Sequence, residues 1–105
     1  MERKIRVAQI GCGKMSKYTM RYAIEKGAEV VLAFDVSKEV IGSDIGSIME
    51  TTNRNVKVED IATLEERLME VKPDIAIVTT MSLLNDLGDV LRIVAKCHVN
   101  AITTC

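Results

Sequence analysis

Features that mark a membrane, secreted or nucleic-acid-binding protein are missing from this 105-residue chain. Its 14 Lys and Arg residues are balanced by 15 Asp and Glu, so the formal net charge of −1 gives no broad basic surface for nucleic acid. No apolar run approaches transmembrane length. The charged start, 1–4, precedes an apolar run that is too short for a signal peptide. We therefore expect neither nucleic acid nor a membrane as partner, and the length leaves room for one domain.

Cysteine and histidine are few and scattered. Cys12, Cys97 and Cys105 show no metal-ligand spacing, and His98 is the only histidine. A zinc site needs clustered ligands, so we expect no metal. An odd number of separated thiols is typical of reduced cysteines, which predicts a cytoplasmic location. We interpret His98 as the left-handed end of a helix, a conformation that His tolerates, rather than as a catalytic group.

The most informative stretch is 5–16, IRVAQIGCGKMS, which reads as a buried strand, a tight glycine turn and the start of a helix. Gly11 permits the sharp turn, and Gly13, with no Cβ, lets the backbone approach a pyrophosphate. A helix that begins near Lys14 directs free N–H groups and the positive end of its dipole at the anion. We do not expect Cys12 to be a nucleophile: helix N–H groups lower a thiol pKa, but no base lies near it in sequence.

This glycine motif departs from the G-x-G-x-x-G fingerprint at its third position, which is Ser16. Serine meets the demand for a small residue there nearly as well as alanine. A Gly-x-Gly turn alone also occurs for purely structural reasons. Asp35 supports the interpretation of this motif as a dinucleotide-binding turn. It ends the next apolar run about 20 residues downstream, where an acid can bind a ribose hydroxyl.

Apolar patterns predict five strands alternating with helices. The expected strands are 4–10, 28–34, 56–58, 74–79 and 101–104, and the expected helices are 14–26, 43–51, 63–72 and 84–97. In the first helix we expect Met15, Tyr18, Tyr22 and Ala23 to form the core-packing face. Alternating strands and helices demand a doubly wound α/β fold with parallel strands, right-handed crossovers and helices on both faces. The expected strand order is 3-2-1-4-5.

A ligand in such a fold binds at the carboxyl ends of the strands, where the strand order reverses. That point lies between the first and fourth strands here. It brings together the glycine turn, Asp35 and the segment 79–81, which holds Thr79, Thr80 and Met81. The two threonines have an alternative role, which is to satisfy backbone groups at the strand end.

Four segments carry a resemblance to a known family: GCGKMS, VVLAFDVSKEVIGSDIG, KPDIAIVTT and VNAITTC. In register over the whole chain they resemble the N-terminal, Rossmann-like part of 2,4-diaminopentanoate dehydrogenase, which is related to dihydrodipicolinate reductase and diaminopimelate dehydrogenase. The resemblance implies an oxidative deamination that depends on NAD or NADP. The amine carbon gives hydride to the cofactor, and water then displaces ammonia from the imine.

The resemblance also implies a set of cofactor-binding residues, in four groups along the chain. Asp35 would meet the adenosine ribose, and Ser37 and Lys38, just past it, could bind a 2′-phosphate. The pyrophosphate would be held by Gly11, Cys12, Gly13, Lys14 and Met15. The other cofactor contacts would come from Thr79, Thr80 and Met81, and from Thr103 and Thr104, which approach the nicotinamide.

Length is the departure from this family, whose members are several times longer and carry a second, catalytic domain. We therefore expect 1–105 to be a dinucleotide-binding domain with no catalytic residue of its own, inactive alone, which meets a small diamino-acid substrate only in a full-length enzyme. We expect homo-oligomers through the edge formed by the last strand or through the helix next to it. The alternatives are a dihydrodipicolinate reductase-like NAD(P)H reductase, a non-catalytic nucleotide sensor and a methyltransferase.

Overall fold

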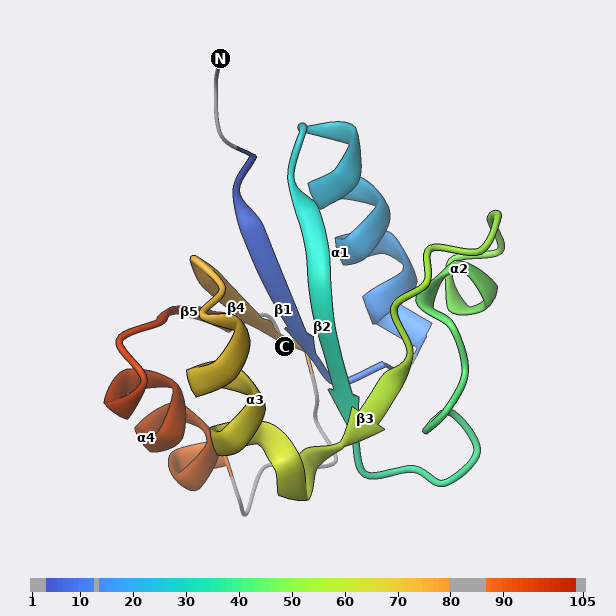
Figure 1. The fold of residues 1–105 in the computed structure, drawn as a ribbon. Helices are drawn as coiled ribbons and strands as arrows, with labels where there is room; N and C mark the ends of the chain where they lie inside the picture. Colours follow the sequence, from blue (N-terminus) through green and yellow to red (C-terminus); the bar gives the residue numbers. More distant parts are fainter. Residues whose placement is uncertain (1–3, 13, 80–86, 104–105) are drawn as a thin grey trace.

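Five strands form one parallel sheet in the computed structural model, which describes residues 4–12, 14–79 and 87–103. The strand order β3-β2-β1-β4-β5 confirms the expected order (Figure 1). The strands are β1 (Arg6–Ile10), β2 (Glu29–Asp35), β3 (Val58–Asp60), β4 (Ile75–Val78) and β5 (Asn100–Thr103). The third strand begins two residues later than its apolar run suggested. Lys57, just before it, forms an isolated antiparallel bridge with Asp44.

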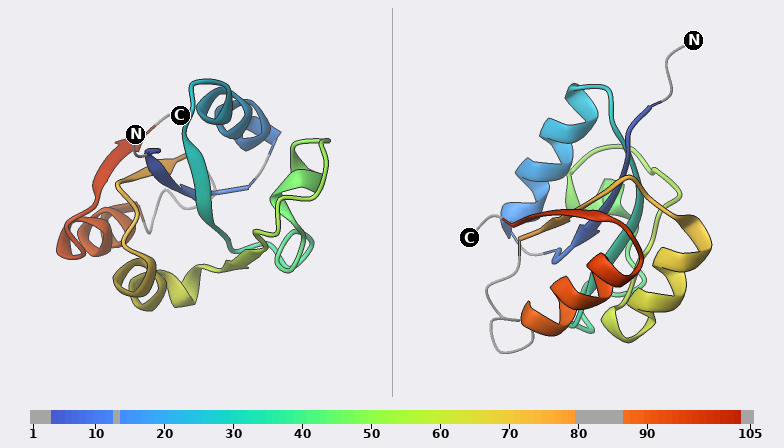
Figure 2. Two further views of the ribbon diagram at one scale, coloured as in Figure 1. Left: turned by 45° about the horizontal axis from the view of Figure 1, so that its top comes forward. Right: turned by 90° about the vertical axis from the view of Figure 1, so that its left-hand side faces the viewer.

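Helices cover both faces of this sheet, as expected from the alternating order. The helices are α1 (Lys14–Glu25), α2 (Ile45–Ile48), the 3-10 turn η1 (Ile61–Thr63), α3 (Leu64–Val71) and α4 (Leu87–Lys96). The two views of Figure 2 show α1 on one side of the sheet and α3 with α4 on the other. Within the described ranges, no helix combines the length and apolarity that a membrane crossing requires.

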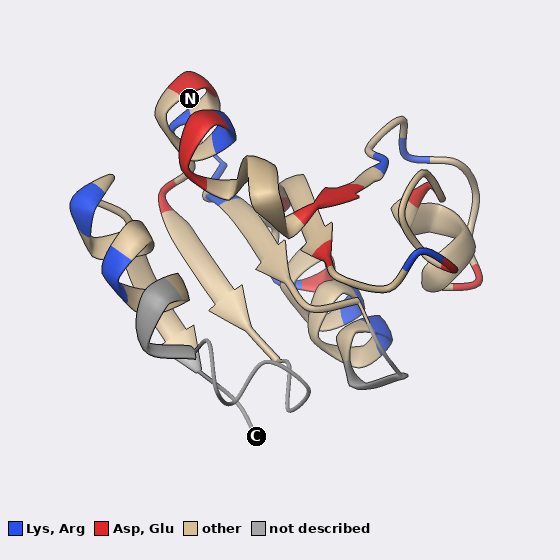
Figure 3. Cartoon of the chain, turned by 90° about the horizontal axis from the view of Figure 1, so that it is seen from below, with Lys and Arg blue, Asp and Glu red and all other residues tan. Residues whose placement is uncertain are grey.

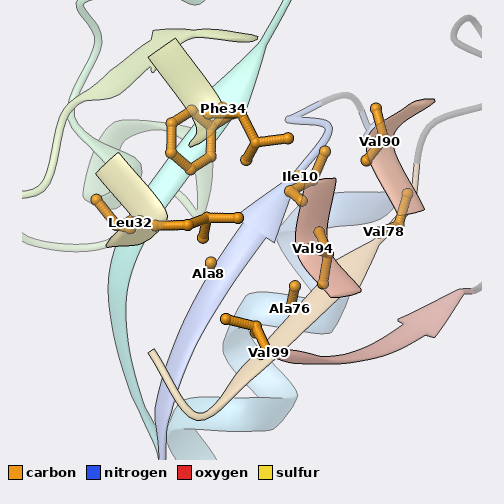
Figure 4. Packing of buried hydrophobic residues seen from close by; sticks show 11 residues of the cluster. Ala8, Ile10, Leu32, Phe34, Ala76, Val78, Val90, Val94 and Val99 are labelled. Atoms are coloured by element: carbon orange, nitrogen blue, oxygen red, sulfur yellow. The ribbon is translucent and has the colours of Figure 1, made fainter. Parts of the chain in front are cut away.

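The face toward α3 and α4 is closed by an apolar cluster (Figure 4). Side chains alternate along a strand. The residues that point to this face are Ala8 and Ile10 of β1, Leu32 and Phe34 of β2, and Ala76 and Val78 of β4. Large side chains from the sheet, such as Ile10 and Phe34, pack against Leu68 of α3 and Val94 of α4, and all four are buried. This cluster fixes the positions of the three central strands, whose ends matter for the site.

The opposite face packs against α1 and α2, and one residue of β1 breaks its apolar character. Val7 and Met20 lie in a second buried cluster with Val30 of β2 and Ile45 of α2. Gln9 lies on the same face of β1 as Val7 and is fully buried. A buried amide in a strand needs hydrogen-bond partners, which are described below.

The expected core face of α1 is wrong for its two tyrosines. Tyr18 and Tyr22 are 59% and 62% exposed, whereas Met20 is fully buried. The helix directs the stripe that contains Ser16 and Met20 at the sheet. The tyrosines instead border a groove of about 660 Å³ over β4 and β5, whose lining includes Ile77. Lys17 of α1 lies over the Tyr18 ring, and Lys26, just past the end of α1, lies over the Tyr22 ring.

Helix ends follow the expected turn chemistry in two places and depart from it in one. Gly27, after α1, has φ +93°, and His98, after α4, has φ +59°, so both end their helices in the left-handed region. The helix expected from Thr63 starts differently, because Asp60 accepts from the Ala62 N–H and opens the 3-10 turn first. The Thr63 hydroxyl makes no cap and donates to the Asp60 carbonyl instead.

Candidate functional site

The carboxyl ends of β1, β2 and β4 lie side by side at one edge of the sheet (Figure 1). Gly11 follows β1, Asp35 ends β2 and Thr79 follows β4. The structure therefore brings these three together at the point where the strand order reverses, as the sequence predicts. Figure 3 looks toward this edge from below and shows charges of both signs spread over helices, loops and strand ends.

Gly11 makes the turn that takes the chain from β1 to α1. Its φ of +98° lies in the region that only glycine enters without strain. Its N–H donates to the Phe34 carbonyl over 2.8 Å, and the Thr79 N–H donates to the Ile10 carbonyl over 3.0 Å. Two strand neighbours therefore hold the beginning of the turn, as expected of a glycine turn rather than a free loop.

Asp35 is buried, with 8% exposure, and its carboxylate accepts three backbone N–H groups. The Cys12 N–H donates to Oδ2 over 2.7 Å. The Val36 and Ser37 N–H groups donate to Oδ1 over 2.6 and 3.1 Å. An ionised carboxylate has about four acceptor positions, so about one position, on Oδ2, is left for a further donor. The carboxylate can therefore accept about one further hydrogen bond from a ligand.

Cys12 is buried behind the turn, where its thiol donates to the Phe34 carbonyl over 3.6 Å. Burial and the negative charge of Asp35 raise the pKa of this thiol to about 12. The direction is opposite to the lowering that helix N–H groups would bring. A thiol that keeps its proton at neutral pH is a poor nucleophile, which supports the expectation of a passive role.

Several expected site residues lie at the margin of the described chain. Lys14 and Met15 form the first residues of α1, and their side chains lie outside the description, as do Gly13, Thr80, Met81 and Thr104. Ser16, in the third position of the motif, is fully buried between α1 and the sheet, where a small residue is needed. The backbone of Thr103 is in β5 and pairs with Val78.

The residues after Asp35 form a turn. The Ser37 carbonyl accepts from the N–H groups of Val40 and Ile41. Its hydroxyl accepts from the Glu39 N–H over 3.3 Å. Lys38 is exposed. Ser37 and Lys38 therefore lie at the start of this turn, directly after Asp35 and Val36, and the Lys38 side chain faces solvent.

Sequence reasoning missed Gln9, which contacts the glycine turn directly. Its Nε2 donates to the Gly11 carbonyl and to Thr79 Oγ1, each over 2.8 Å. The only signal was a single amide within the apolar strand, between Ala8 and Ile10. Such a residue implies buried partners but does not identify them.

No group of three or more His, Cys, Asp or Glu side chains that could hold a metal ion occurs in the part of the chain that the structure describes. The polar groups described at this edge are backbone N–H donors, hydroxyls and the accepting carboxylate of Asp35. That set suits the phosphates and hydroxyls of a nucleotide.

No protein-family model and no curated protein sequence matches the chain. Solved structures do resemble it. An amine dehydrogenase from Mycobacterium smegmatis is 33% identical with a TM-score of 0.85, over 97% of this chain and 30% of that enzyme. The chain thus spans less than a third of the enzyme's length.

Two more distant structures share the fold. RSP, a Rex-family repressor whose structure was solved with β-NADH, is 20% identical with a TM-score of 0.78, over 97% of this chain and 46% of that protein. UDP-D-quinovosamine 4-dehydrogenase from Vibrio fischeri is 15% identical with a TM-score of 0.66, over 98% of this chain and 80% of that one. At these identities the likeness shows a shared Rossmann-like fold and nothing more.

Proposed function

We propose that this chain is the NAD(P)-binding domain of an oxidoreductase that acts on an amino group. The observation that carries the proposal is the contact between the glycine turn and the acid of the second strand, in which the Cys12 N–H donates to Asp35 Oδ2. It joins the residues proposed for the pyrophosphate to the residue proposed for the ribose. Both lie where the strand order reverses, which is where nucleotides bind in this class of sheet.

The residues at this edge fit a dinucleotide. Gly11 gives a turn with no side chain on its surface, and the Cys12 side chain is buried behind the turn rather than in front of it. The start of α1 offers N–H groups and a positive dipole end to a pyrophosphate. One acceptor position left on Asp35 matches one ribose hydroxyl, and we propose that Thr79 lines the cofactor site beyond β4.

The amine dehydrogenase supports an amino-group substrate, because it alone among the three structures above is more than 30% identical. In such a reaction the nicotinamide supplies a hydride acceptor: the C–H bond next to nitrogen breaks, and the resulting imine is hydrolysed to a carbonyl and ammonia. We propose a small diamino acid, on the resemblance to 2,4-diaminopentanoate dehydrogenase. The substrate groups and the catalytic residues would belong to a longer chain.

The choice between NAD and NADP depends on Asp35 and the turn after it. The buried carboxylate would repel a 2′-phosphate, which favours NAD. Ser37 and Lys38 oppose this preference, because an exposed lysine that follows the acid closely in sequence can pair with that phosphate. We therefore propose an enzyme that prefers NAD and tolerates NADP.

Two other functions share this fold. A dihydrodipicolinate reductase-like enzyme would use the same cofactor site for the reverse hydride transfer. A nucleotide sensor is represented by the Rex-family structure, which is only 20% identical and so carries less weight than the amine dehydrogenase.

Titration calorimetry of the purified chain with NADH, NADPH and S-adenosylmethionine tests the proposal. We expect saturable binding of NADH, weaker binding of NADPH and none of S-adenosylmethionine. Binding of S-adenosylmethionine alone would point to a methyltransferase and contradict the proposal. Binding of none of the three would remove the cofactor assignment.

We also propose that the chain forms homo-oligomers through β5, an edge strand of the described sheet. Ile102 in this strand is 47% exposed, and no charged residue lies within 100–103 to discourage pairing with a second copy. Light scattering should show a dimer in the parent and a monomer in Ile102→Lys. A monomeric parent at high concentration would refute this proposal.

A further inference from the structure

We propose that Gln9 is a positioning residue that sets the orientation of the Gly11–Cys12 peptide for dinucleotide binding, an inference that rests on the proposed function. Gln9 is fully buried in β1, beneath α1. It cannot touch a ligand at the edge of the sheet, so any effect on binding must pass through the turn.

The carbonyl end of the Gly11–Cys12 peptide has two donors. Gln9 Nε2 donates to the Gly11 oxygen over 2.8 Å, and the Thr79 hydroxyl donates to the same oxygen over 3.2 Å. Gln9 also donates to the Thr79 oxygen over 2.8 Å, which closes a triangle. The turn is therefore tied both to its own strand and to the end of β4.

The N–H end of the same peptide is held from the other side. The Cys12 N–H donates to Asp35 Oδ2 over 2.7 Å. One peptide unit is thus fixed at its oxygen by Gln9 and Thr79 and at its hydrogen by Asp35. Because the peptide is planar, a rotation that breaks one set of bonds also disturbs the other. The residues proposed for the ribose and for the region beyond β4 are therefore coupled through this plane.

The orientation of the Gln9 amide follows from its surroundings. The Gly11 oxygen only accepts hydrogen bonds, so the amide group that faces it must be the NH₂. The amide oxygen then faces Thr19 of α1, whose hydroxyl lies 3.2 Å away. That hydroxyl also lies 3.0 Å from the Ser16 carbonyl. The Gln9 side chain is therefore held at both ends, which makes it a rigid support.

An apolar residue would fill this place in the strand more simply, since a buried amide is tolerated only when its groups are paired. The bonds of Gln9 are all directed at the turn and the elements that carry it. A purely structural amide would stabilise the fold and leave ligand affinity unchanged. A positioning amide would also alter the affinity of the folded protein.

Gln9→Met tests this difference, because it keeps the length of the side chain and removes its donor. NADH affinity would be measured by calorimetry well below the unfolding temperature, for the parent, for Gln9→Met and for the control Arg6→Met. Arg6→Met removes side-chain bonds at the opposite end of β1. We expect Gln9→Met to raise the Kd for NADH about five- to tenfold, the range that follows from one or two lost hydrogen bonds, and Arg6→Met to leave it unchanged.

A second readout follows the turn without a ligand. In a background with Cys97→Ser and Cys105→Ser, Cys12 is the only thiol, and it is buried. Its rate of alkylation at pH 8 should rise in Gln9→Met, because a released turn exposes the thiol, and should not rise in Arg6→Met. Equal rates in the parent and Gln9→Met would overturn the inference.

The outcomes separate this inference from the proposed function. Failure of the parent to bind NADH or NADPH would overturn both. Binding by the parent, with the same affinity in folded Gln9→Met, would overturn the role of Gln9 alone. If Gln9→Met does not fold, NMR of the unsubstituted chain replaces this test. We then expect slow hydrogen exchange of the Gln9 side-chain amide and a shift of its NMR signals on NADH binding. Rapid exchange with no shift would overturn the inference.

Discussion

The two ends of β1 are both tied to β4 by polar groups, but in different ways. At the amino end the Arg6 N–H donates to Asp74 Oδ2, and the Asp74 N–H donates to the Arg6 carbonyl, each over 2.8 Å. The Arg6 guanidinium donates to the Val71 and Lys72 carbonyls at the end of α3. At the carboxyl end the ties run through Gln9, Thr79 and the Gly11 carbonyl.

The difference lies in what each end has left to offer a ligand. At the amino end, Arg6 and Asp74 bond to each other, and the Arg6 guanidinium binds carbonyls that the end of α3 leaves unpaired. The carboxyl end holds a left-handed glycine, the N-terminus of α1 and a carboxylate with an acceptor position to spare. We infer that the amino end serves stability and the carboxyl end serves binding. The predictions below test this division, from the largest expected effect to the smallest.

Gly13→Val should have the largest effect on binding. Gly13 lies outside the described residues, so this prediction comes from the motif alone: a branched side chain would stand where the pyrophosphate approaches. Calorimetry should show NADH affinity reduced about a hundredfold or more, with near-normal circular dichroism. Unchanged affinity in a folded variant would remove the glycine turn from the site.

Asp35→Ala should weaken NADH binding about tenfold, the effect of losing a charged hydrogen-bond partner, and weaken NADPH binding less. Asp44 is the matched control, because its carboxylate also accepts three backbone N–H groups, from Gly46, Arg54 and Val56. Both alanine variants should lower the melting temperature, and Asp35→Ala alone should change affinity. An equal loss for both dinucleotides would mean that Asp35 does not read the ribose.

Arg6→Met should lower the free energy of unfolding by about 1 kcal/mol, the usual net value of such hydrogen bonds. Chemical denaturation would measure it. Arg21→Met, at an exposed position of α1, serves as control and should have little effect. NADH affinity should stay the same in both variants. A large loss of NADH affinity in Arg6→Met would contradict the inference that the amino end of β1 serves stability alone.

Cys12→Ala should have the smallest effect on binding and a distinct effect on pH dependence. The thiol pKa is about 12 in the folded chain against an ordinary 9.0, so the unfolded chain loses this proton first as the pH rises. Stability therefore falls between about pH 9 and 12, and part of that fall should vanish in Cys12→Ala. Denaturation at pH 7 and pH 10 would measure it. A strong loss of NADH affinity would contradict the passive role.

The sequence predicted the strand order and the meeting of Gly11, Asp35 and Thr79, because parallel topology leaves few choices once the elements alternate. It did not predict the partners of Gln9, which lie 2, 10 and 70 residues away in sequence. It also placed Tyr18 and Tyr22 of α1 in the core, where the structure exposes them. Periodicity identifies apolar stripes on a helix but not which of two overlapping stripes faces the sheet, and only packing directs Met20 inward and Tyr18 outward.

Amide chemical-shift mapping of the isotope-labelled chain during an NADH titration tests the central claim most directly, because it observes both ends of β1 at once. We predict saturable shifts at the carboxyl end, for Gly11, Cys12, Val36 and Thr79. The amides of Arg6, Lys72 and Asp74 at the amino end should stay unchanged. Shifts confined to the amino end, or no saturable shift at either end, would contradict the account.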